Sequence, residues 1–177
     1  MPGIVTQLHR NADHGFSKPS EPTLHLVAGM GVEGDAHFGA TVRHRSRVAA
    51  DPTQPNLRQV HLIQAELLEE LAAEGFRVGP GDLGENITAA GVDLLSLPVG
   101  SVLRIGEALL GVTGLRNPCR QIEHFEKGLL KRVTDSSGHG RHRAGVMAVV
   151  LHGGQVAVGD TVDCSPPPGP PIPLTRV

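Results

Sequence analysis

Short apolar runs separated by glycine-containing turns are the feature that most limits the folds open to this chain. Two pairs of such runs flank Gly106-Glu107 and Gly153-Gly154, an arrangement that is typical of β-hairpins. The expected strands cover residues 4–9, 24–28, 58–63, 102–105, 108–113, 146–152 and 155–158. Many short runs with few helices between them favour a mainly β barrel over an alternating βαβ sheet.

Only two segments have the apolar spacing of a helix. Residues 64–74 place Leu67, Leu68 and Leu71 on one face, and Gly75 is the expected C-cap. A second helix is expected to begin at Asn117, with Pro118 at its first position and an apolar face that reaches residues 129–130. The sequence thus predicts a barrel with a few peripheral helices.

The composition limits the classes of partner. The chain has 177 residues, which suit one domain, and a net charge of -2 with 19% charged residues, so we expect no nucleic-acid partner. Aromatic residues make up 2% of the chain, too few for a base-stacking platform. No apolar run approaches the ~20 residues of a membrane span, and the first four residues lack the basic start of a signal peptide. We therefore expect a cytoplasmic protein without a membrane partner.

The chain is expected to divide into one domain over residues 1–164 and a proline-rich extended tail over residues 165–177. Prolines recur between Pro166 and Pro173, and each lacks the N–H that a sheet ladder needs. A disordered end and a proline-rich ligand are both compatible with this composition. In either case we expect the tail to contribute few hydrogen bonds and little core.

Cys119 is the candidate reactive or metal-binding residue of the chain. It lies at the expected start of the second helix, between Arg116 and Arg120. The positive end of a helix and two guanidinium groups favour the thiolate, which is the form that attacks, carries sulfur or binds a soft metal. A buried structural cysteine is the alternative, and the polar neighbours argue against it. Cys164, next to the proline-rich tail, is expected to have no role.

Two glycine-rich stretches have the spacing of a dinucleotide fingerprint, namely residues 29–34 and 79–84. Neither opens a helix directly after a strand, so we interpret both as loops whose backbone can approach an anion. Two short basic clusters, residues 43–47 and 141–143, fit either solvated loops or a phosphate clamp. Scattered histidines such as His44 and His61 lack the spacing of a zinc motif, so we expect no histidine-based metal site.

Seven stretches, in order along the chain, resemble the MOSC domain, the module named after the C-terminal part of molybdenum cofactor sulfurases. The stretches are Gly31–His37, Arg58–Leu62, Gly84–Ile87, Gly91–Leu94, Leu97–Gly100, Arg116–Gln121 and Gly159–Val162. Each stretch alone has low specificity, whereas the ordered series around Asn-Pro-Cys is specific. The resemblance is to the stand-alone bacterial form of this family, and it covers the chain up to Asp163.

The resemblance implies a β-barrel of the pyruvate-kinase-barrel type and one functional cysteine, which Cys119 matches. In this family the cysteine is either a sulfur carrier or the protein ligand to molybdenum in a pterin cofactor. Such a cofactor needs a thiolate for its metal, arginines for its phosphate and open backbone for its pterin. Besides Cys119, the residues expected to bind it are Gly34, Asp35, His37, Arg58, Asn86, Arg116 and Arg120.

Three functions follow from the resemblance and the residues. The first is a terminal reductase component that acts on small N-hydroxylated compounds and takes electrons from a separate donor protein. The second is a sulfur carrier that holds a persulfide on Cys119, received from a pyridoxal-phosphate-dependent cysteine desulfurase. With three lysines and 177 residues, no pyridoxal phosphate site is apparent in this chain itself. The third is a non-catalytic module that binds a cofactor or another anion.

Overall fold

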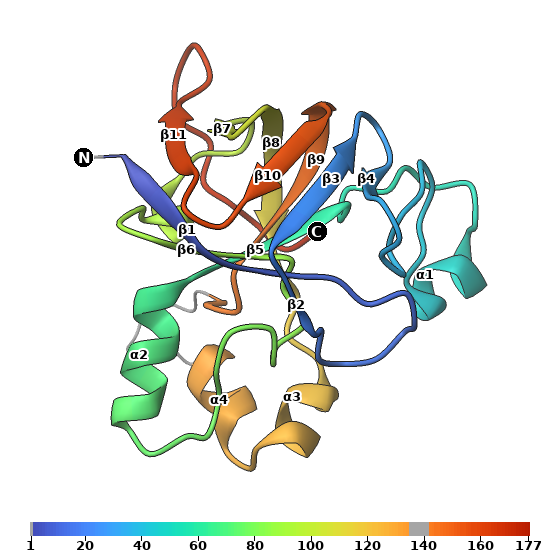
Figure 1. The fold of residues 1–177 in the computed structure, drawn as a ribbon. Helices are drawn as coiled ribbons and strands as arrows, with labels where there is room; N and C mark the ends of the chain where they lie inside the picture. The colour runs from blue at the N-terminus through green and yellow to red at the C-terminus, as the bar shows by residue number, and fades with distance from the viewer. Residues whose placement is uncertain (1, 135–141) are drawn as a thin grey trace.

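A computed structural model describes residues 2–134 and 142–177, and within them seven strands close into a barrel (Figure 1). Going around the barrel, the order is β11-β7-β8-β9-β5-β6-β1, and β1 pairs with β11 to close it. The strands are β1 (Gly3–His9), β5 (Val60–Gln64), β6 (Ile87–Ala90), β7 (Val102–Ile105), β8 (Ala108–Leu115), β9 (Val146–His152) and β11 (Thr161–Ser165). The predicted mainly β barrel is confirmed.

The barrel interior is filled by aliphatic side chains from every strand. On β7, Leu103 and Ile105 are buried while Arg104 between them is exposed, which is the period of two expected of a strand with one face on the core. The hairpin predicted at Gly106-Glu107 is confirmed, since Ile105 pairs with Ala108 across it. Alternation along the sequence therefore identified most of the barrel strands.

A smaller sheet of β10 (Gly154–Ala157), β3 (Thr23–Val27) and β4 (Gly31–Val32) packs beside the barrel. The predicted hairpin between residues 146–152 and 155–158 is wrong, because β10 pairs with β3 and not with β9. The chain leaves the barrel at Gly153, where a Cβ atom would lie 2.6 Å from the main-chain oxygen of Leu26. The glycines there allow a close crossing between the two sheets. A short strand, β2 (Ser20–Glu21), pairs with the end of β1.

Helix α2 (Ala65–Ala73) connects β5 to β6, the parallel pair of the barrel. It buries Leu67, Leu68 and Leu71 as predicted, and Gly75 follows its C-cap Glu74 with a φ of +95° that ends the helix. Figure 1 shows α2, α3 (Arg120–Phe125) and α4 (Leu129–Thr134) together below the barrel. Their apolar faces form a second core. A 3₁₀ helix spans Leu94–Ser96.

The helix predicted from Asn117 to residue 130 is wrong in its start and its continuity. Helix α3 begins at Arg120, and Cys119 is its N-cap residue with an extended backbone. The helix stops after six residues, and Gly128, with a φ of +85°, separates it from α4. A further helix, α1 (Arg45–Ala50), forms within the basic segment where only a loop was expected. None of the helices in the described part of the chain is long and apolar enough to cross a membrane.

A buried ion pair joins two loops at one end of the barrel. Lys18, on the loop between β1 and β2, lies 2.8 Å from Asp35, and the two side chains are 3% and 0% exposed. Burial alone would raise the pKa of Asp35, but hydrogen bonds from His37 and the charge of Lys18 outweigh it and hold this pKa well below its usual range. The carboxylate therefore stays charged inside the protein.

The predicted tail begins one residue too early, because Ser165 is the last residue of β11. Residues 166–177 form no helix or strand, bend at residues 168–170 and then pack on the barrel. Thr175 accepts a hydrogen bond from the amide of Leu115 at 2.7 Å, and Val177 donates one back to the same residue. Leu174 packs against the barrel core. The expectation that the tail makes few hydrogen bonds is therefore wrong, since a strand edge on β8 was free to pair with the non-proline part of the tail.

We expect a Gly114→Ala substitution to detach this tail. A Cβ at Gly114 would lie 2.5 Å from both the main-chain oxygen of Thr175 and a methyl group of Val177. Losing the hydrogen bond to Leu115 removes about 1 kcal/mol, so the amide of Leu115 should exchange with deuterium about fivefold faster or more. Gly111→Ala on the same strand is the control, because its Cβ would meet only the side chain of Leu151 at 3.3 Å. Equal exchange rates in the two variants would contradict the packed tail.

We expect Lys18→Met to lower the free energy of unfolding by about 3–5 kcal/mol, because it leaves the Asp35 carboxylate buried without a counter-charge. Urea denaturation at pH 7 measures this loss. Arg10→Met is the matched control: it removes the exposed ion pair with Glu21, at 3.0 Å, and should cost about 0–1 kcal/mol.

Acid should reduce the difference between Lys18→Met and the unsubstituted protein. A carboxyl with a lowered pKa stabilises the fold above its ordinary pKa of 3.8, and this contribution is lost as the pH falls below that value. Once Asp35 is protonated and neutral, its burial no longer requires the counter-charge of Lys18. A difference that stays constant from pH 7 down to the acid limit of folding would contradict the proposed charge pairing.

Candidate functional site

A cavity of about 370 Å³ opens beside the barrel at the end where the Lys18–Asp35 pair lies. Its walls come from segments far apart in sequence: the β1–β2 loop, the start of α1, the strands β5 and β9, and the segment between β8 and α3. The side chains that carry charge or chemistry in these walls are His14, Lys18, His37, His44, Arg45, Arg58, His61, Asn86, Arg116, Cys119 and Gln121.

The cavity is cationic. Among the residues that the structure describes, no lining side chain is acidic, whereas Lys18, Arg45, Arg58 and Arg116 all line it. Burial and the nearby charges of Arg47 and Arg116 lower the pKa of Arg58 to about 10, so its guanidinium remains charged at neutral pH. The cavity therefore favours an anion.

Two guanidinium groups in the walls have buried N–H donors that make no hydrogen bond within the described residues. Within the described ranges, Arg58 Nε and Arg116 Nη1 are buried without a hydrogen-bond partner. Arg58 Nη2 donates to the main-chain oxygen of Val177 in the tail, and the Arg116 guanidinium lies 6.0 Å from the ring centre of Phe16. Buried donors are normally satisfied, so these two point to an anionic ligand.

Cys119 lies in the wall of the same cavity. Its side chain is partly buried, and its thiol lies 3.5 Å from Gln121 Oε1 as a hydrogen-bond donor. The proximity of Cys119 to Arg58 and Arg116 is enough for a thiolate to interact with both charges. The other cysteine, Cys164, is exposed on β11. The structure thus distinguishes a cysteine in a cationic cavity from one on the outer surface.

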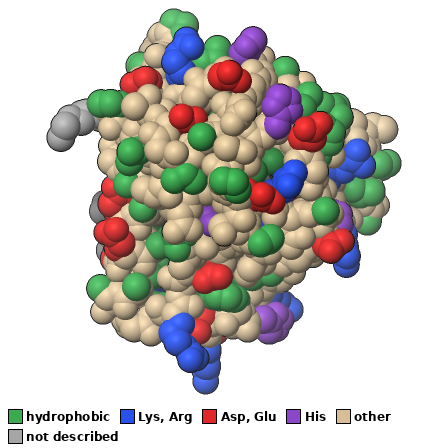
Figure 2. All heavy atoms as spheres, viewed as in Figure 1, with side chains coloured by type: hydrophobic (Ala, Val, Ile, Leu, Met, Phe, Trp, Pro, Cys, Tyr) green, Lys and Arg blue, Asp and Glu red, His purple; other side chains and the backbone are tan. Residues whose placement is uncertain are grey.

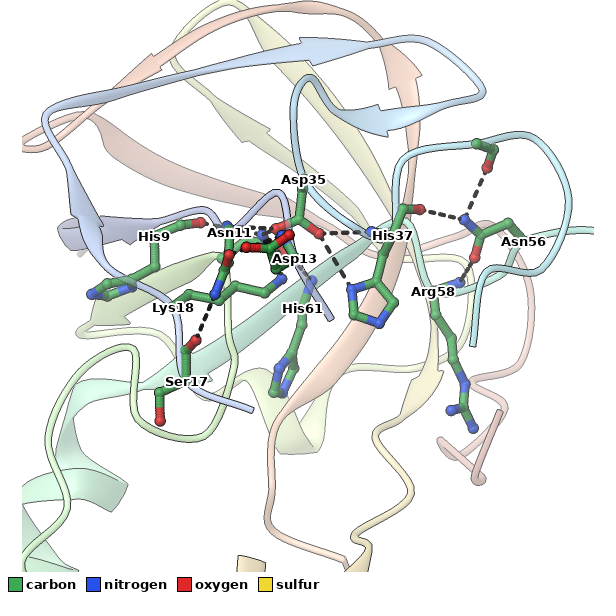
Figure 3. A network of polar contacts seen from close by, with 12 residues as sticks. His9, Asn11, Asp13, Ser17, Lys18, Asp35, His37, Asn56, Arg58 and His61 are labelled. Atoms are coloured by element: carbon green, nitrogen blue, oxygen red, sulfur yellow. Dashed lines mark hydrogen bonds and ion pairs between the residues drawn. The ribbon is translucent and has the colours of Figure 1, made fainter. Parts of the chain in front are cut away.

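A network of polar contacts lies behind the cavity wall (Figure 3). Asp35 accepts hydrogen bonds from the His37 amide at 3.0 Å and from Asn86 Nδ2 at 3.2 Å, and His37 Nδ1 lies 3.3 Å from the same carboxylate. Asn86 also accepts a hydrogen bond from the amide of His61. Together with Lys18, the cavity residues His37 and Asn86 therefore contact one buried carboxylate.

Five of the eight predicted site residues line this cavity, namely His37, Arg58, Asn86, Arg116 and Cys119. The other three do not. Asp35 lies behind the wall, in contact with three residues that line it. Gly34 has a φ of +77° and packs on Arg10, while Arg120 is exposed at the start of α3. Arg120 lies away from the cavity because the helix begins two residues later than expected.

The two basic clusters have different surroundings. In the first, His44, Arg45 and Ser46 line the cavity at the start of α1. In the second, Arg141 lies outside the described residues, and Arg143 donates to Glu70 on α2 at 3.0 Å. The first cluster therefore contributes to the cavity wall, whereas Arg143 of the second cluster contacts helix α2.

Lys18 and His61 also line the cavity, although the sequence does not predict them as site residues. Lys18 is buried in the cavity wall, and its position in a polar loop gave no sign of this. His61 is buried at 5% exposure, and its Nε2 donates to the carbonyl of Ala144 at 2.7 Å. Burial lowers the pKa of His61 well below its ordinary value, so this ring is neutral. The apolar residues on both sides of His61 were the available signal for a buried ring.

Outside the cavity the surface is mixed. Acidic, basic and hydrophobic side chains are interspersed on the face seen in Figure 2, so this face has no broad patch of one charge. No group of three or more histidine, cysteine or acidic side chains within the described ranges is placed to hold a metal ion.

Comparisons with known proteins agree with this fold. The YuaD protein from Bacillus subtilis is 25% identical and has a TM-score of 0.76, over 93% of this chain and 96% of its own. YiiM from Escherichia coli is 19% identical with a TM-score of 0.64, over 97% of this chain and 72% of its own. YiiM from Geobacillus stearothermophilus is 16% identical with a TM-score of 0.66, over 93% and 75%. The likeness to the YiiM proteins shows the fold alone.

A comparison with curated proteins gave no match. The family model described as the MOSC domain matches residues 33–163, nearly three quarters of the chain. That range contains the barrel strands β5 to β9, most of β11, and the cavity residues from His37 to Met147. The chain therefore belongs to the MOSC domain family, which is associated with molybdenum cofactor binding and sulfur transfer.

Proposed function

We propose that the cavity binds the molybdenum cofactor, with Cys119 as the protein ligand to the metal, and that the protein is the terminal reductase component for N-hydroxylated compounds. One observation carries the proposal: Cys119 shares a cavity with four cationic side chains, and two of these have buried donors that find no partner among the described residues. A soft ligand next to unsatisfied guanidinium donors matches a group that combines a metal with a phosphate.

The residues of the cavity fit such a cofactor. Arg58 and Arg116 would hold the phosphate, because their N–H donors are buried and charged. Cys119 would supply the thiolate. The bound cofactor would supply a metal centre that accepts electrons from a separate donor protein and passes them to the substrate.

The protein groups around the cavity have roles that do not depend on the metal. Arg58 and Arg116 place positive charge in the cavity that Cys119 lines. Phe16 and Met147 also line the cavity and give it apolar surface. The Asp35 network fixes Asn86 and His37 at the rear wall. A rigid polar wall of this kind orients a ligand with little loss of freedom on binding.

A sulfur carrier is the second candidate, and the partial exposure of Cys119 favours it. A persulfide on this residue would lie beside Arg58 and Arg116, which stabilise its negative charge. Metal analysis and intact mass together distinguish the two functions. Molybdenum and pterin in protein purified from a cofactor-producing host support the reductase, whereas one additional sulfur atom on Cys119 supports the carrier.

We expect Cys119→Ser to abolish bound molybdenum while the fold remains intact. The hydroxyl fits the space of the thiol but is not ionised at neutral pH and is a poor ligand for a soft metal. Elemental analysis and pterin fluorescence measure the loss, and circular dichroism reports the fold. Cys164→Ser is the control and should retain the metal, since this residue is exposed on β11. Full metal content in Cys119→Ser would rule out the proposed ligand.

We expect Arg58→Gln to weaken retention of the cofactor by about 10–100-fold, which is the value of one charge-assisted hydrogen bond of about 1.5–3 kcal/mol. The rate at which cofactor is lost during gel filtration measures this change. Arg104→Gln on β7 removes an exposed arginine outside the cavity, and this variant should behave like the unsubstituted protein. If both variants retain cofactor equally, Arg58 does not hold the phosphate.

A further inference from the structure

His37 is held in one orientation by the buried carboxylate of Asp35. The carboxylate accepts hydrogen bonds from the His37 amide at 3.0 Å, and His37 Nδ1 lies 3.3 Å from the same oxygen. The His37 side chain is 31% exposed, and the residue lines the cavity. Figure 3 shows one ring nitrogen turned toward Asp35 and the other turned away from it. No hydrogen bond from the described residues engages the second nitrogen, Nε2, which leaves it available to a ligand.

The protonation of the His37 ring follows from the state of Asp35. Lys18 at 2.8 Å and Asn86 at 3.2 Å both donate to the other oxygen of this carboxylate, so Asp35 is ionised and can only accept. His37 Nδ1 must therefore carry a proton in order to bond to it. In the neutral ring, Nε2 is then the nitrogen that gains and loses a proton, as in other histidine–carboxylate pairs.

We propose that His37, oriented by Asp35 and Lys18, is the group that donates a proton from Nε2 to the leaving oxygen when an N-hydroxylated substrate is reduced. This inference rests on the proposed reductase function. His37 is the catalytic residue in it, while Asp35 and Lys18 are positioning residues that act through the histidine.

The reaction needs a proton donor in the cavity, which His37 lines. Reduction of an amidoxime breaks its N–O bond and consumes two electrons, which the separate donor protein supplies through the cofactor. The leaving oxygen already carries one hydrogen, and a proton from His37 Nε2 converts it to water. A second proton from solvent goes to the nitrogen and gives the amidine. His37 then recovers its proton from solvent.

The other described basic groups of the cavity are less suited to this step. His14, whose ring centre lies 5.8 Å from that of His37, is exposed, and no carboxylate among the described residues orients it. His61 is neutral, and its Nε2 is bonded to the Ala144 carbonyl. His44 Nδ1 is paired with Ser46 Oγ at 2.9 Å, and burial together with the charge of Arg58 lowers the pKa of His44. Lys18 lines the cavity, but its Nζ is paired with the Asp35 carboxylate. Arginine side chains do not release protons near neutral pH.

The first test needs neither cofactor nor activity. Nitrogen NMR of the histidine side chains in cofactor-free protein at pH 8 reports which ring nitrogen carries hydrogen, and the signals missing in His37→Gln assign the ring. We expect the Nδ1–H form to dominate for His37, and we expect this preference to be lost in Asp35→Asn, with Glu21→Gln as a folded control. A dominant Nε2–H form in the unsubstituted protein would overturn the proposal.

The second test measures reduction of an aryl amidoxime by cofactor-loaded protein with reduced methyl viologen as electron source. In His37→Ala we expect kcat to fall by about 10²–10⁴-fold, with molybdenum content and KM within about twofold. Added imidazole should restore a saturable part of the rate, which a structural role for His37 does not predict. His25→Ala, at an exposed position on β3, is the control and should keep its rate.

The outcomes separate this proposal from the one on which it rests. If the unsubstituted protein reduces the amidoxime and His37→Ala keeps its rate, or loses it without rescue by imidazole, the role of His37 is wrong while the reductase function stands. If the loaded, unsubstituted protein does not reduce amidoximes, the reductase function is wrong and the proton donor is wrong with it. The NMR result then still establishes whether Asp35 orients the ring.

Discussion

The pairing of Lys18 with Asp35 is the interaction on which the candidate site depends. Two charges with almost no exposed surface are costly unless they neutralise each other, and at 2.8 Å they do so. The pair fixes the β1–β2 loop, which carries Lys18, against the turn after β4, which carries Asp35. His37 and Asn86 then bond to the same carboxylate. One ion pair therefore holds the rear wall of the cavity in place.

The barrel could be predicted from local patterns, whereas the partners of its strands could not in every case. Alternation and a glycine turn correctly paired β7 with β8, because neighbouring strands with a two-residue connection have little alternative. The same signal misled at Gly153-Gly154, where β10 pairs with β3, a strand some 130 residues earlier. That choice depends on the close approach of Gly153 to Leu26, a contact that no local pattern contains.

In the candidate site, too, the types of the functional residues could be predicted from the sequence, whereas the positions of some of them could not. Arginine, asparagine and cysteine in the stretches that resemble the family identified Arg58, Asn86, Arg116 and Cys119, and all four line the cavity. Arg120 was selected because it adjoins Cys119, but a helix that starts there directs it to solvent. Lys18 could not be predicted as a site residue, because a lysine in a polar loop normally remains exposed and only the fold places a carboxylate beside it.

The tail and the cavity share Arg58, which links the stability of one to the chemistry of the other. Arg58 Nη2 donates to the main-chain oxygen of Val177, and the tail itself is held to β8 through Leu115. A guanidinium fixed at one nitrogen cannot turn freely, so its Nε, which has no partner among the described residues, keeps a defined direction. The absence of a side chain at Gly114 is what lets the tail lie close enough for this contact. A glycine on a barrel strand thus contributes to the orientation of an arginine in the candidate site.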